Sequence, residues 1–153
     1  DDEKSAFAAQ KNQHYVALIQ ALTPADILPG MTEFLAEIKR EGYVASVASA
    51  SKNAPTILKK LGIMADFVGI VDPATLSHGK PDPEIFTKAG ELLKLQPTQI
   101  IGLEDASAGV QAIKGAGQTA LGIGTAAKEA QPNIWFAETK EISLANISKQ
   151  MNE

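Results

Sequence analysis

Residues 100–123 read IIGLEDASAGVQAIKGAGQTALGI, and this stretch decides the fold. The short apolar run Ile100–Leu103 predicts a buried strand, Ser107–Gly115 predicts a helix, and Thr119–Ile123 predicts a second strand. A strand, a helix and another strand in this order indicate two parallel strands of one sheet, joined by a crossover helix. The stretch therefore indicates an α/β fold.

The same alternation continues on both sides of this stretch. Toward the N-terminus, apolar runs predict two more buried strands, Tyr43–Ala48 and Phe67–Val71, separated by a helix over Ala54–Leu61 that Gly62 ends. Toward the C-terminus, Ile134–Phe136 predicts a short edge strand. We therefore expect an open, doubly wound parallel sheet of the Rossmann-like kind, with flanking helices.

Further helices are expected before and between these strands. Apolar residues recur at helical spacing in Ser5–Ala21, and this helix ends before Pro24 because the residue preceding proline avoids the α region. A second helix ends at Gly42, and a third begins at Asp82 and Pro83, since aspartate is a common N-cap and proline fits the first turn. The second helix has Phe34, Leu35 and Ile38 on one face. The third is expected to bury Ile85, Phe86, Ala89, Leu92 and Leu93.

The composition fits a single domain that meets neither nucleic acid nor membrane. The 153 residues carry a net charge of −4, and the 14 Lys and Arg are scattered, so we expect no nucleic-acid partner. No apolar run approaches the roughly 20 residues that span a bilayer, and the acidic start does not resemble a signal peptide. The absence of cysteine excludes disulfides and thiolate chemistry, and we predict a cytoplasmic protein.

The residues that follow each predicted strand are the candidates for a site, because ligands of open α/β sheets bind beyond the carboxyl ends of the strands. Ser49, Ala50, Ser51, Lys52 and Asn53 follow the first strand. Hydroxyl groups and free amides at the start of a helix, with a lysine beside them, are suited to binding an anion. The structural alternative is a polar loop in which Ser51 or Asn53 caps the next helix.

After the second strand, Lys80 lies in the segment GKPDP, residues 79–83. Glycine and two prolines make a stiff segment that aims the ammonium group with little entropy to lose, and a compact positive charge suits phosphate. The structural alternative is a turn with a solvated lysine. The Lys80–Pro81 bond is a candidate cis peptide, since proline lowers the cost of the cis form to about 0.5–1 kcal/mol.

After the third strand, Glu104 and Asp105 are adjacent. Two neighbouring carboxylates repel each other unless a cation compensates them, and Mg²⁺ prefers such oxygen ligands together with waters and phosphate oxygens. The structural alternative is that Asp105 caps the following helix. Because the three strand ends meet at one edge of the sheet, the most economical prediction is a phosphate and Mg²⁺ site. His14 and His78 receive no role.

These residues resemble a known family. Ser49, Lys80 within GKPDP, and Glu104 with Asp105 resemble, in order and spacing, the second, third and fourth motifs of the haloacid dehalogenase superfamily. The segments SASKN (49–53) and GLEDASAG (102–109) are similar to those of its β-phosphoglucomutase branch. The resemblance covers nearly the whole chain. It implies a phosphotransferase that interconverts β-glucose 1-phosphate and glucose 6-phosphate through an aspartyl-phosphate with Mg²⁺.

The resemblance also implies site residues. Ser49 and Lys80, the catalytic residues of this chain, would hold the transferring phosphoryl group together with the backbone amide of Ala50. Residues 51–53 would bind the other phosphate of a bisphosphorylated sugar, and the acidic pair would bind Mg²⁺. Residues 1–28 would be the remnant of a helical cap domain and its hinge, from which Lys11 reaches the substrate, and residues 29–153 would be the α/β core domain.

One family motif has no match in this chain. The first motif is Asp-x-Asp at the end of an N-terminal strand, and its first aspartate is the nucleophile, whereas Asp1 and Asp2 precede a predicted helix. We therefore expect a truncated chain, inactive alone, that lacks the usual central strand between those ending at Ala48 and Leu103. Its partners would be a phosphorylated sugar and the missing N-terminal segment, and the full-length protein would be a monomer.

Two other functions remain open. A sugar-phosphate phosphatase on the same scaffold differs in whether water reaches the phosphoenzyme, and residues 51–53 favour the mutase because a second phosphate needs a binding site. A non-catalytic binding domain is the alternative from another class. It predicts that Glu104 and Asp105 lie far from Lys80 and Ser49.

Overall fold

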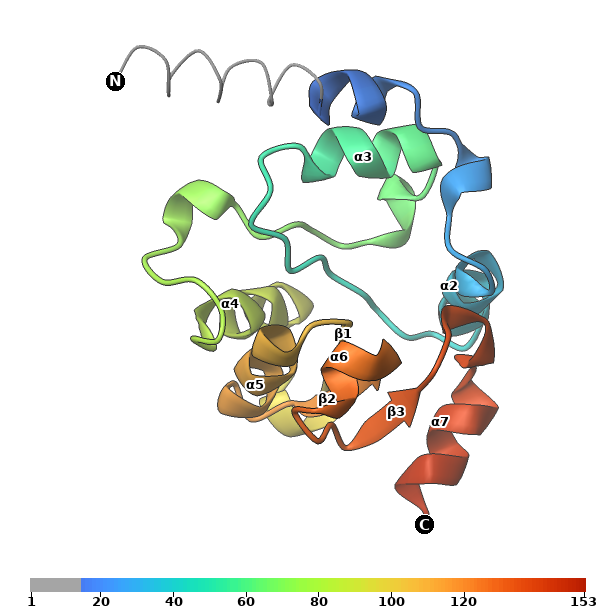
Figure 1. Cartoon of the computed structure of the whole chain (residues 1–153), viewed down its shortest axis with the longest axis vertical. Helices are drawn as coiled ribbons and strands as arrows, with labels where there is room; N and C mark the ends of the chain where they lie inside the picture. The colour runs from blue at the N-terminus through green and yellow to red at the C-terminus, as the bar shows by residue number, and fades with distance from the viewer. Residues whose placement is uncertain (1–14) are drawn as a thin grey trace.

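Three parallel strands form the sheet in the computed structural model, which describes residues 15–153 (Figure 1). β1 (Ile101–Glu104), β2 (Thr119–Ile123) and β3 (Ile134–Phe136) lie in that order, and the register places Gly102 beside Ala120. β2 and β3 have the predicted bounds, and β1 is displaced by one residue. The α/β class with a parallel sheet and flanking helices is confirmed.

Helices and short 3-10 turns make up the remaining regular structure. The 3-10 turns are η1 (Pro24–Asp26), η2 (Met64–Asp66), η3 (Pro73–Thr75), η4 (Pro97–Gln99) and η5 (Thr139–Glu141). The helices are α2 (Met31–Arg40), α3 (Ala54–Leu61), α4 (Glu84–Leu93), α5 (Ser107–Gly115), α6 (Gly124–Lys128) and α7 (Leu144–Met151). Residues 15–20 are also helical, whereas residues 5–14 of the predicted first helix lie outside the described part. Within that part, no helix has the length and apolar character needed to cross a membrane.

The ends of the helices follow the predicted signals. Gly62, at φ 76°, ends α3, and Gly42, at φ 83°, follows the last turn of α2. These left-handed conformations carry a steric cost for residues with a Cβ, which is why glycine is common there. α4 begins at Glu84, whose amide donates a hydrogen bond to the Asp82 carboxylate. The prediction that Leu92 is buried was wrong, because its side chain remains 40 % exposed.

The sheet is covered on both faces, as a doubly wound fold requires. On one face, Ala120 of β2 packs among buried residues of α4, α5 and α6, including Phe86, Ile113 and Ala127. On the other face, the next residue of β2, Leu121, packs against buried residues of α2, β3 and α7. Because neighbouring residues of a strand point to opposite faces, β2 is buried from both sides.

The predicted strands Tyr43–Ala48 and Phe67–Val71 do not form regular strands. They run parallel and join at a single bridge between Val47 and Ile70, with the amides of Val47, Val68 and Val71 donating hydrogen bonds across the pair. Tyr43, Val44 and Val68 remain about half exposed or more. The direction of pairing was therefore predicted correctly, but regular strand structure was not.

The irregular structure of these two segments is explained by missing hydrogen-bond partners along the edge of residues 43–48 that faces away from residues 67–71. Among residues 15–153, the segment around Val47 pairs only with residues 68–71, and β1 pairs only with β2. A segment that pairs on one edge only, and over only a few residues, lacks many of the hydrogen bonds that hold a strand in a sheet. The central strand expected between these two edges stays a prediction, and so does the division at residue 28.

Candidate functional site

An ion pair joins the loop between η3 and α4 (residues 76–83), which we call the lysine loop, to the carboxyl end of β1. The Nζ atom of Lys80 lies 2.6 Å from Oε2 of Glu104, and their side chains are 31 % and 11 % exposed. The same ammonium group lies 5.4 Å from the ring centroid of Phe86 on α4, within the range of a cation–π contact. Two of the predicted site residues, which are 24 positions apart, are thus in direct contact.

The Glu104 carboxylate is fixed from several sides. Its Oε1 atom accepts hydrogen bonds from the amides of Asp105 at 3.0 Å and Ala106 at 3.2 Å, which leaves Oε2 for Lys80. A Cβ atom at Gly109 would lie 2.0 Å from Cγ of Glu104, so only glycine leaves room for this side chain against α5. Burial raises the pKa of Glu104, but the hydrogen bond from Lys80, the neighbouring Asp105 and the amide of Ala106 bring it below its ordinary 4.5.

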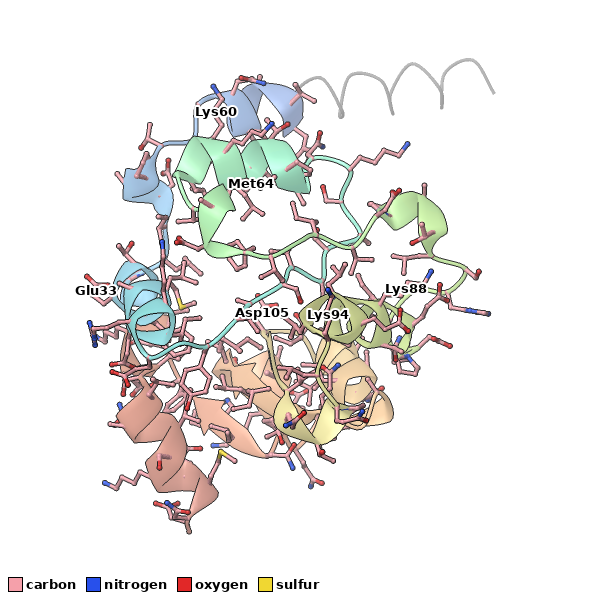
Figure 2. All side chains as sticks on the ribbon, turned by 180° about the vertical axis from the view of Figure 1, so that it is seen from behind. Glu33, Lys60, Met64, Lys88, Lys94 and Asp105 are labelled. Atoms are coloured by element: carbon pink, nitrogen blue, oxygen red, sulfur yellow. The ribbon has the colours of Figure 1, made fainter. Side chains whose placement is uncertain are left out.

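Asp105 is the less compensated member of the acidic pair. Its hydrogen-bonding interaction with the Glu104 carboxylate is the main cause that raises the pKa of Asp105 above its ordinary 3.8, and partial burial and charge repulsion add to it. The helix-capping alternative is wrong, because the N-cap of α5 is Ala106, without a side-chain hydrogen bond. In Figure 2, Asp105 projects onto the middle of the molecule, above the sheet. A cation bound there would relieve the repulsion between the two carboxylates.

Residues 49–53, which we call the hydroxyl loop, lead into α3 (Figure 1). Hydrogen bonds within the loop stabilise it. Oγ of Ser49 accepts the amide of Ser51 at 3.1 Å, and Oγ of Ser51 accepts the amide of Asn53 at 3.1 Å. Asn53 is the N-cap of α3, although its side chain makes no capping hydrogen bond. The structural alternative is therefore met only in part: Asn53 takes the N-cap position, whereas Ser51 orders the turn before α3 and does not cap the helix. Both serines still have a hydroxyl hydrogen to donate.

The structure brings together only some of the predicted site residues. Among residues 15–153, no hydrogen bond or ion pair connects residues 49–53 with Lys80, Glu104 or Asp105. Ala50 and Lys52 are exposed, and Lys11 lies outside the described residues. The prediction of a cis Lys80–Pro81 peptide is confirmed.

Two residues of the site region went unrecognised in the sequence. Gly109 lies in the predicted helix Ser107–Gly115, but only the structure shows that it leaves the room that the Glu104 side chain occupies. Glu84 accepts hydrogen bonds from the amides of Ser77 and His78 in the lysine loop. The available signal was the position of Glu84 in the first turn of the helix that follows GKPDP, because an acidic residue there is favourable beside the free amides of the helix N-terminus.

The fold and the site together define an α/β protein with a cationic and an acidic group at the carboxyl end of β1. Such an arrangement suits a ligand that combines an anion with a divalent cation. The model of the haloacid dehalogenase-like hydrolases matches residues 1–117. The chain belongs to this family.

Similar proteins include β-phosphoglucomutases and sugar-phosphate phosphatases. The chain is 40 % identical to β-phosphoglucomutase of Bacillus subtilis over 151 residues, which cover 99 % of this chain and 67 % of that protein. A crystal structure of β-phosphoglucomutase from Clostridium difficile superposes with a TM-score of 0.90 at 36 % identity, over 99 % of this chain and 68 % of that one. Fructose-1-phosphate phosphatase of Escherichia coli is 32 % identical over 84 residues, or 55 % of this chain and 45 % of its own length.

Replacing Asp105 with asparagine is expected to stabilise the fold at neutral pH in the absence of Mg²⁺. Because the folded state raises the pKa of Asp105, ionisation of this group lowers stability as the pH rises through and above 3.8. Asparagine removes the negative charge and can donate a hydrogen bond to Glu104. The expected gain is about 0.5 kcal/mol, because the group is largely solvated.

Urea unfolding at two pH values tests this expectation. The difference in stability between Asp105→Asn and the wild type should disappear below pH 3.8, where Asp105 is protonated in both the folded and the unfolded state. Glu91→Gln, which neutralises an exposed carboxylate on α4, is the control and should give no such pH-dependent gain. An Asp105→Asn variant less stable than the wild type at neutral pH would contradict the predicted repulsion.

Proposed function

We propose that the protein carrying this chain is a β-phosphoglucomutase-like phosphotransferase that interconverts β-glucose 1-phosphate and glucose 6-phosphate with Mg²⁺. The contact of 2.6 Å between Lys80 and Glu104 carries the proposal, because it joins the lysine loop and the acidic pair at the end of β1. The 40 % identity to the Bacillus subtilis enzyme supports this choice of reaction.

The donor set fits Mg²⁺. Glu104 and Asp105 offer only oxygen atoms, and the raised pKa of Asp105 reflects negative charge that a cation would balance. These two residues would hold the ion, with waters and phosphate oxygens as its other ligands. Bound there, Mg²⁺ would neutralise charge on the transferring phosphoryl group.

The other residues of the chain would position phosphate groups. Lys80, already paired with Glu104, would place its ammonium charge beside the phosphoryl oxygens. Ser49 accepts a hydrogen bond from the amide of Ser51 and keeps its hydroxyl hydrogen to donate. Ala50, which is exposed, would offer its backbone amide. Residues 51–53, at the N-terminus of α3, would bind the second phosphate of a bisphosphorylated sugar.

The nucleophile of the proposed reaction is an aspartate outside residues 15–153. It would take the phosphoryl group from one sugar oxygen and return it to another, so that the sugar and not water is the acceptor. Lys11 would contact the sugar from the cap, and the hinge would lie before residue 29.

The decisive assay supplies the protein with β-glucose 1-phosphate, MgCl₂ and a trace of glucose 1,6-bisphosphate as the phosphoryl donor. We expect glucose 6-phosphate to form much faster than free phosphate, and chelation of Mg²⁺ to stop it. A matched sample with Glu104→Gln should be inactive. Phosphate release without isomerised sugar would refute the mutase assignment.

The second candidate is a sugar-phosphate phosphatase of the same family. The 32 % identity to fructose-1-phosphate phosphatase of Escherichia coli favours it, although the match covers only 55 % of this chain. The same assay separates the two candidates, because a phosphatase releases phosphate from several sugar phosphates and does not require a second phosphate site at residues 51–53.

A further inference from the structure

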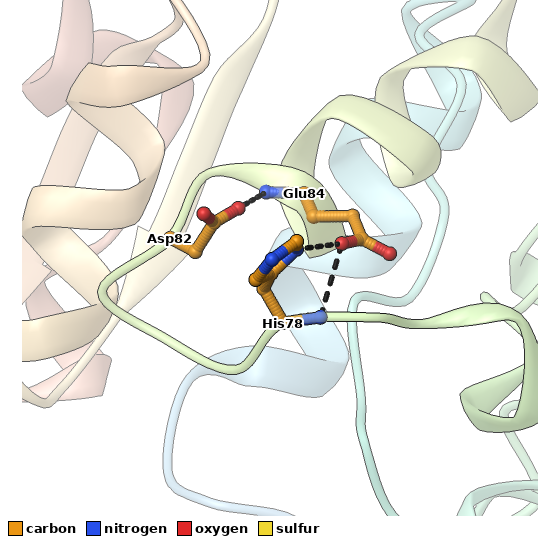
Figure 3. Close-up of side chains that lie close together, drawn as sticks. All are labelled: His78, Asp82 and Glu84. Carbon is orange, nitrogen blue, oxygen red and sulfur yellow. Dashed lines mark hydrogen bonds and ion pairs between the residues drawn. The ribbon is translucent and has the colours of Figure 1, made fainter.

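A second group of ionisable side chains lies beside the lysine loop and outside the proposed phosphate site. His78, Asp82 and Glu84 each place one nitrogen or oxygen atom within 4.8 Å of the others (Figure 3). His78 and Asp82 belong to the loop that carries Lys80, whereas Glu84 is the first residue of α4. The group therefore connects the loop to the helix.

The side chains and amides of this group bind one another. Glu84 accepts the amide of Ser77 at 2.7 Å, the amide of His78 at 3.1 Å and the ring nitrogen Nδ1 of His78 at 3.0 Å. In return, the amide of Glu84 donates to Asp82 at 3.0 Å. We call Glu84 with Ser77, His78 and Asp82 the Glu84 clasp.

His78 Nδ1, Asp82 Oδ1 and both carboxylate oxygens of Glu84 are already engaged inside the clasp. His78 is 67 % exposed, and its ring nitrogen lies against Glu84, whose side chain is 17 % exposed. The amide of Ser77 is the main cause that lowers the pKa of Glu84, followed by the His78 side chain, so the carboxylate is charged when it binds the loop. These contacts attach the loop to α4, because the Glu84 carboxylate accepts hydrogen bonds from several donors of the loop.

The clasp fixes both ends of a short segment that contains Lys80. Ser77 and His78 are held on one side and Asp82 on the other, and the amide of Asp82 donates to the carbonyl of Gly79 at 3.0 Å. Lys88, one turn further along α4, adds a hydrogen bond of 2.5 Å to the carbonyl of Thr75. α4 also supplies the Phe86 ring over which the Lys80 ammonium lies.

We propose that Glu84 is a positioning residue, which holds the loop on α4 so that the ammonium group of Lys80 stays at the anion site beside Glu104. The proposal deepens the proposed function and rests on it for the role of Lys80. The clasp itself rests only on the contacts described above. Pre-ordering of this kind reduces the entropy that Lys80 loses when an anion binds.

The first arm of the test measures amide hydrogen exchange in residues 76–83, and it does not depend on activity. Glu84→Ala should speed the exchange of the Ser77 and His78 amides about tenfold or more, because both lose a charged acceptor. Lys80→Ala and the matched control Glu91→Ala should leave this exchange unchanged. Exchange in Glu84→Ala equal to that of the wild type would overturn the clasp.

The second arm measures binding of inorganic phosphate in MgCl₂ by calorimetry in a double-mutant cycle. Glu84→Ala should weaken binding about tenfold in the wild type and have no further effect in Lys80→Ala, because Glu84 acts through Lys80. Additive losses would overturn the positioning role, since a general loss of structure does not depend on Lys80. Unchanged binding in Lys80→Ala would refute the proposed function and the positioning role together, while the exchange result still decides the clasp.

Two further variants complete the test. If Glu84→Ala fails to fold, Glu84→Gln replaces it, because glutamine keeps one acceptor oxygen. The amides of Ser77 and His78 should then exchange faster than in the wild type but slower than amides without any acceptor. His78→Ala keeps both amide bonds to Glu84 and should change exchange and phosphate binding by less than about twofold. Protection that requires added ZnCl₂ and disappears in His78→Ala would overturn the clasp in favour of a metal site.

Discussion

Replacing Gly109 with alanine is expected to displace Glu104 and weaken Mg²⁺ binding about 10–100-fold. The added Cβ would lie 2.0 Å from Cγ and 2.1 Å from Oε2 of Glu104, so the glutamate must rotate away. Rotation would break the ion pair with Lys80 and the hydrogen bonds to the amides of Asp105 and Ala106. The overlap costs about 1–3 kcal/mol, partly offset by the better helix propensity of alanine.

Gly115→Ala is the matched control, because it adds the same methyl group to the same helix. Its Cβ would lie 3.2 Å from Pro83 and would not meet Glu104. Calorimetric titration with Mg²⁺ in the presence of inorganic phosphate measures the effect, and circular dichroism shows that both variants fold. Equal Mg²⁺ affinity in the two variants would mean that Glu104 is not a ligand.

Replacing Lys80 with methionine is expected to reduce phosphoryl transfer about 10²–10³-fold, the usual effect of removing a group that stabilises transition-state charge. Methionine retains the unbranched apolar shape over Phe86 but leaves Glu104, whose side chain is 11 % exposed, without its cation. The stability loss should be about 1–3 kcal/mol, between the values for exposed and buried ion pairs.

This loss of stability should depend on pH with a definite sign. The pKa of Glu104 is lowered in the folded state. The ion pair therefore contributes fully to stability above pH 4.5, and this contribution disappears as the pH falls through the folded-state pKa. Urea unfolding of Lys80→Met should therefore approach that of the wild type in acid. Lys59→Met, on the exposed side of α3, is the control and should retain activity. Full activity of Lys80→Met would remove Lys80 from the site.

The sequence was most informative where local chemistry determines structure. The bounds of α3, α5, β2 and β3 followed from apolar runs, Gly62 and the alternation of strand and helix, all of which act within a few residues. The contact between Lys80 and Glu104 was also predictable, because parallel strands bring their carboxyl ends to one edge of the sheet.

The features that could not be predicted depend on distant partners. Regular strand structure at Tyr43–Ala48 depends on partners elsewhere in the chain, and its own residues do not show over what length those partners pair with it. Leu92 shows helical periodicity but lies where the described part covers it only partly, beside Gly69. The role of Gly109 requires the position of Glu104, and that of Glu84 requires the path of the loop before it.

Glu104 and Lys80 are held by residues at different distances along the chain. β1, α5 and β2 are consecutive, and α5 packs on β1 so closely that a Cβ at Gly102 would lie 2.7 Å from Ile113. Lys80 lies 24 residues before Glu104, so its arrival closes a longer loop. Because short-range contacts form faster than long-range ones, we expect the turn at Glu104 to take shape first during folding. The amides of Asp105 and Ala106 would then orient the Glu104 carboxylate before Lys80 reaches it. The ion pair would therefore form on a carboxylate that is already in place.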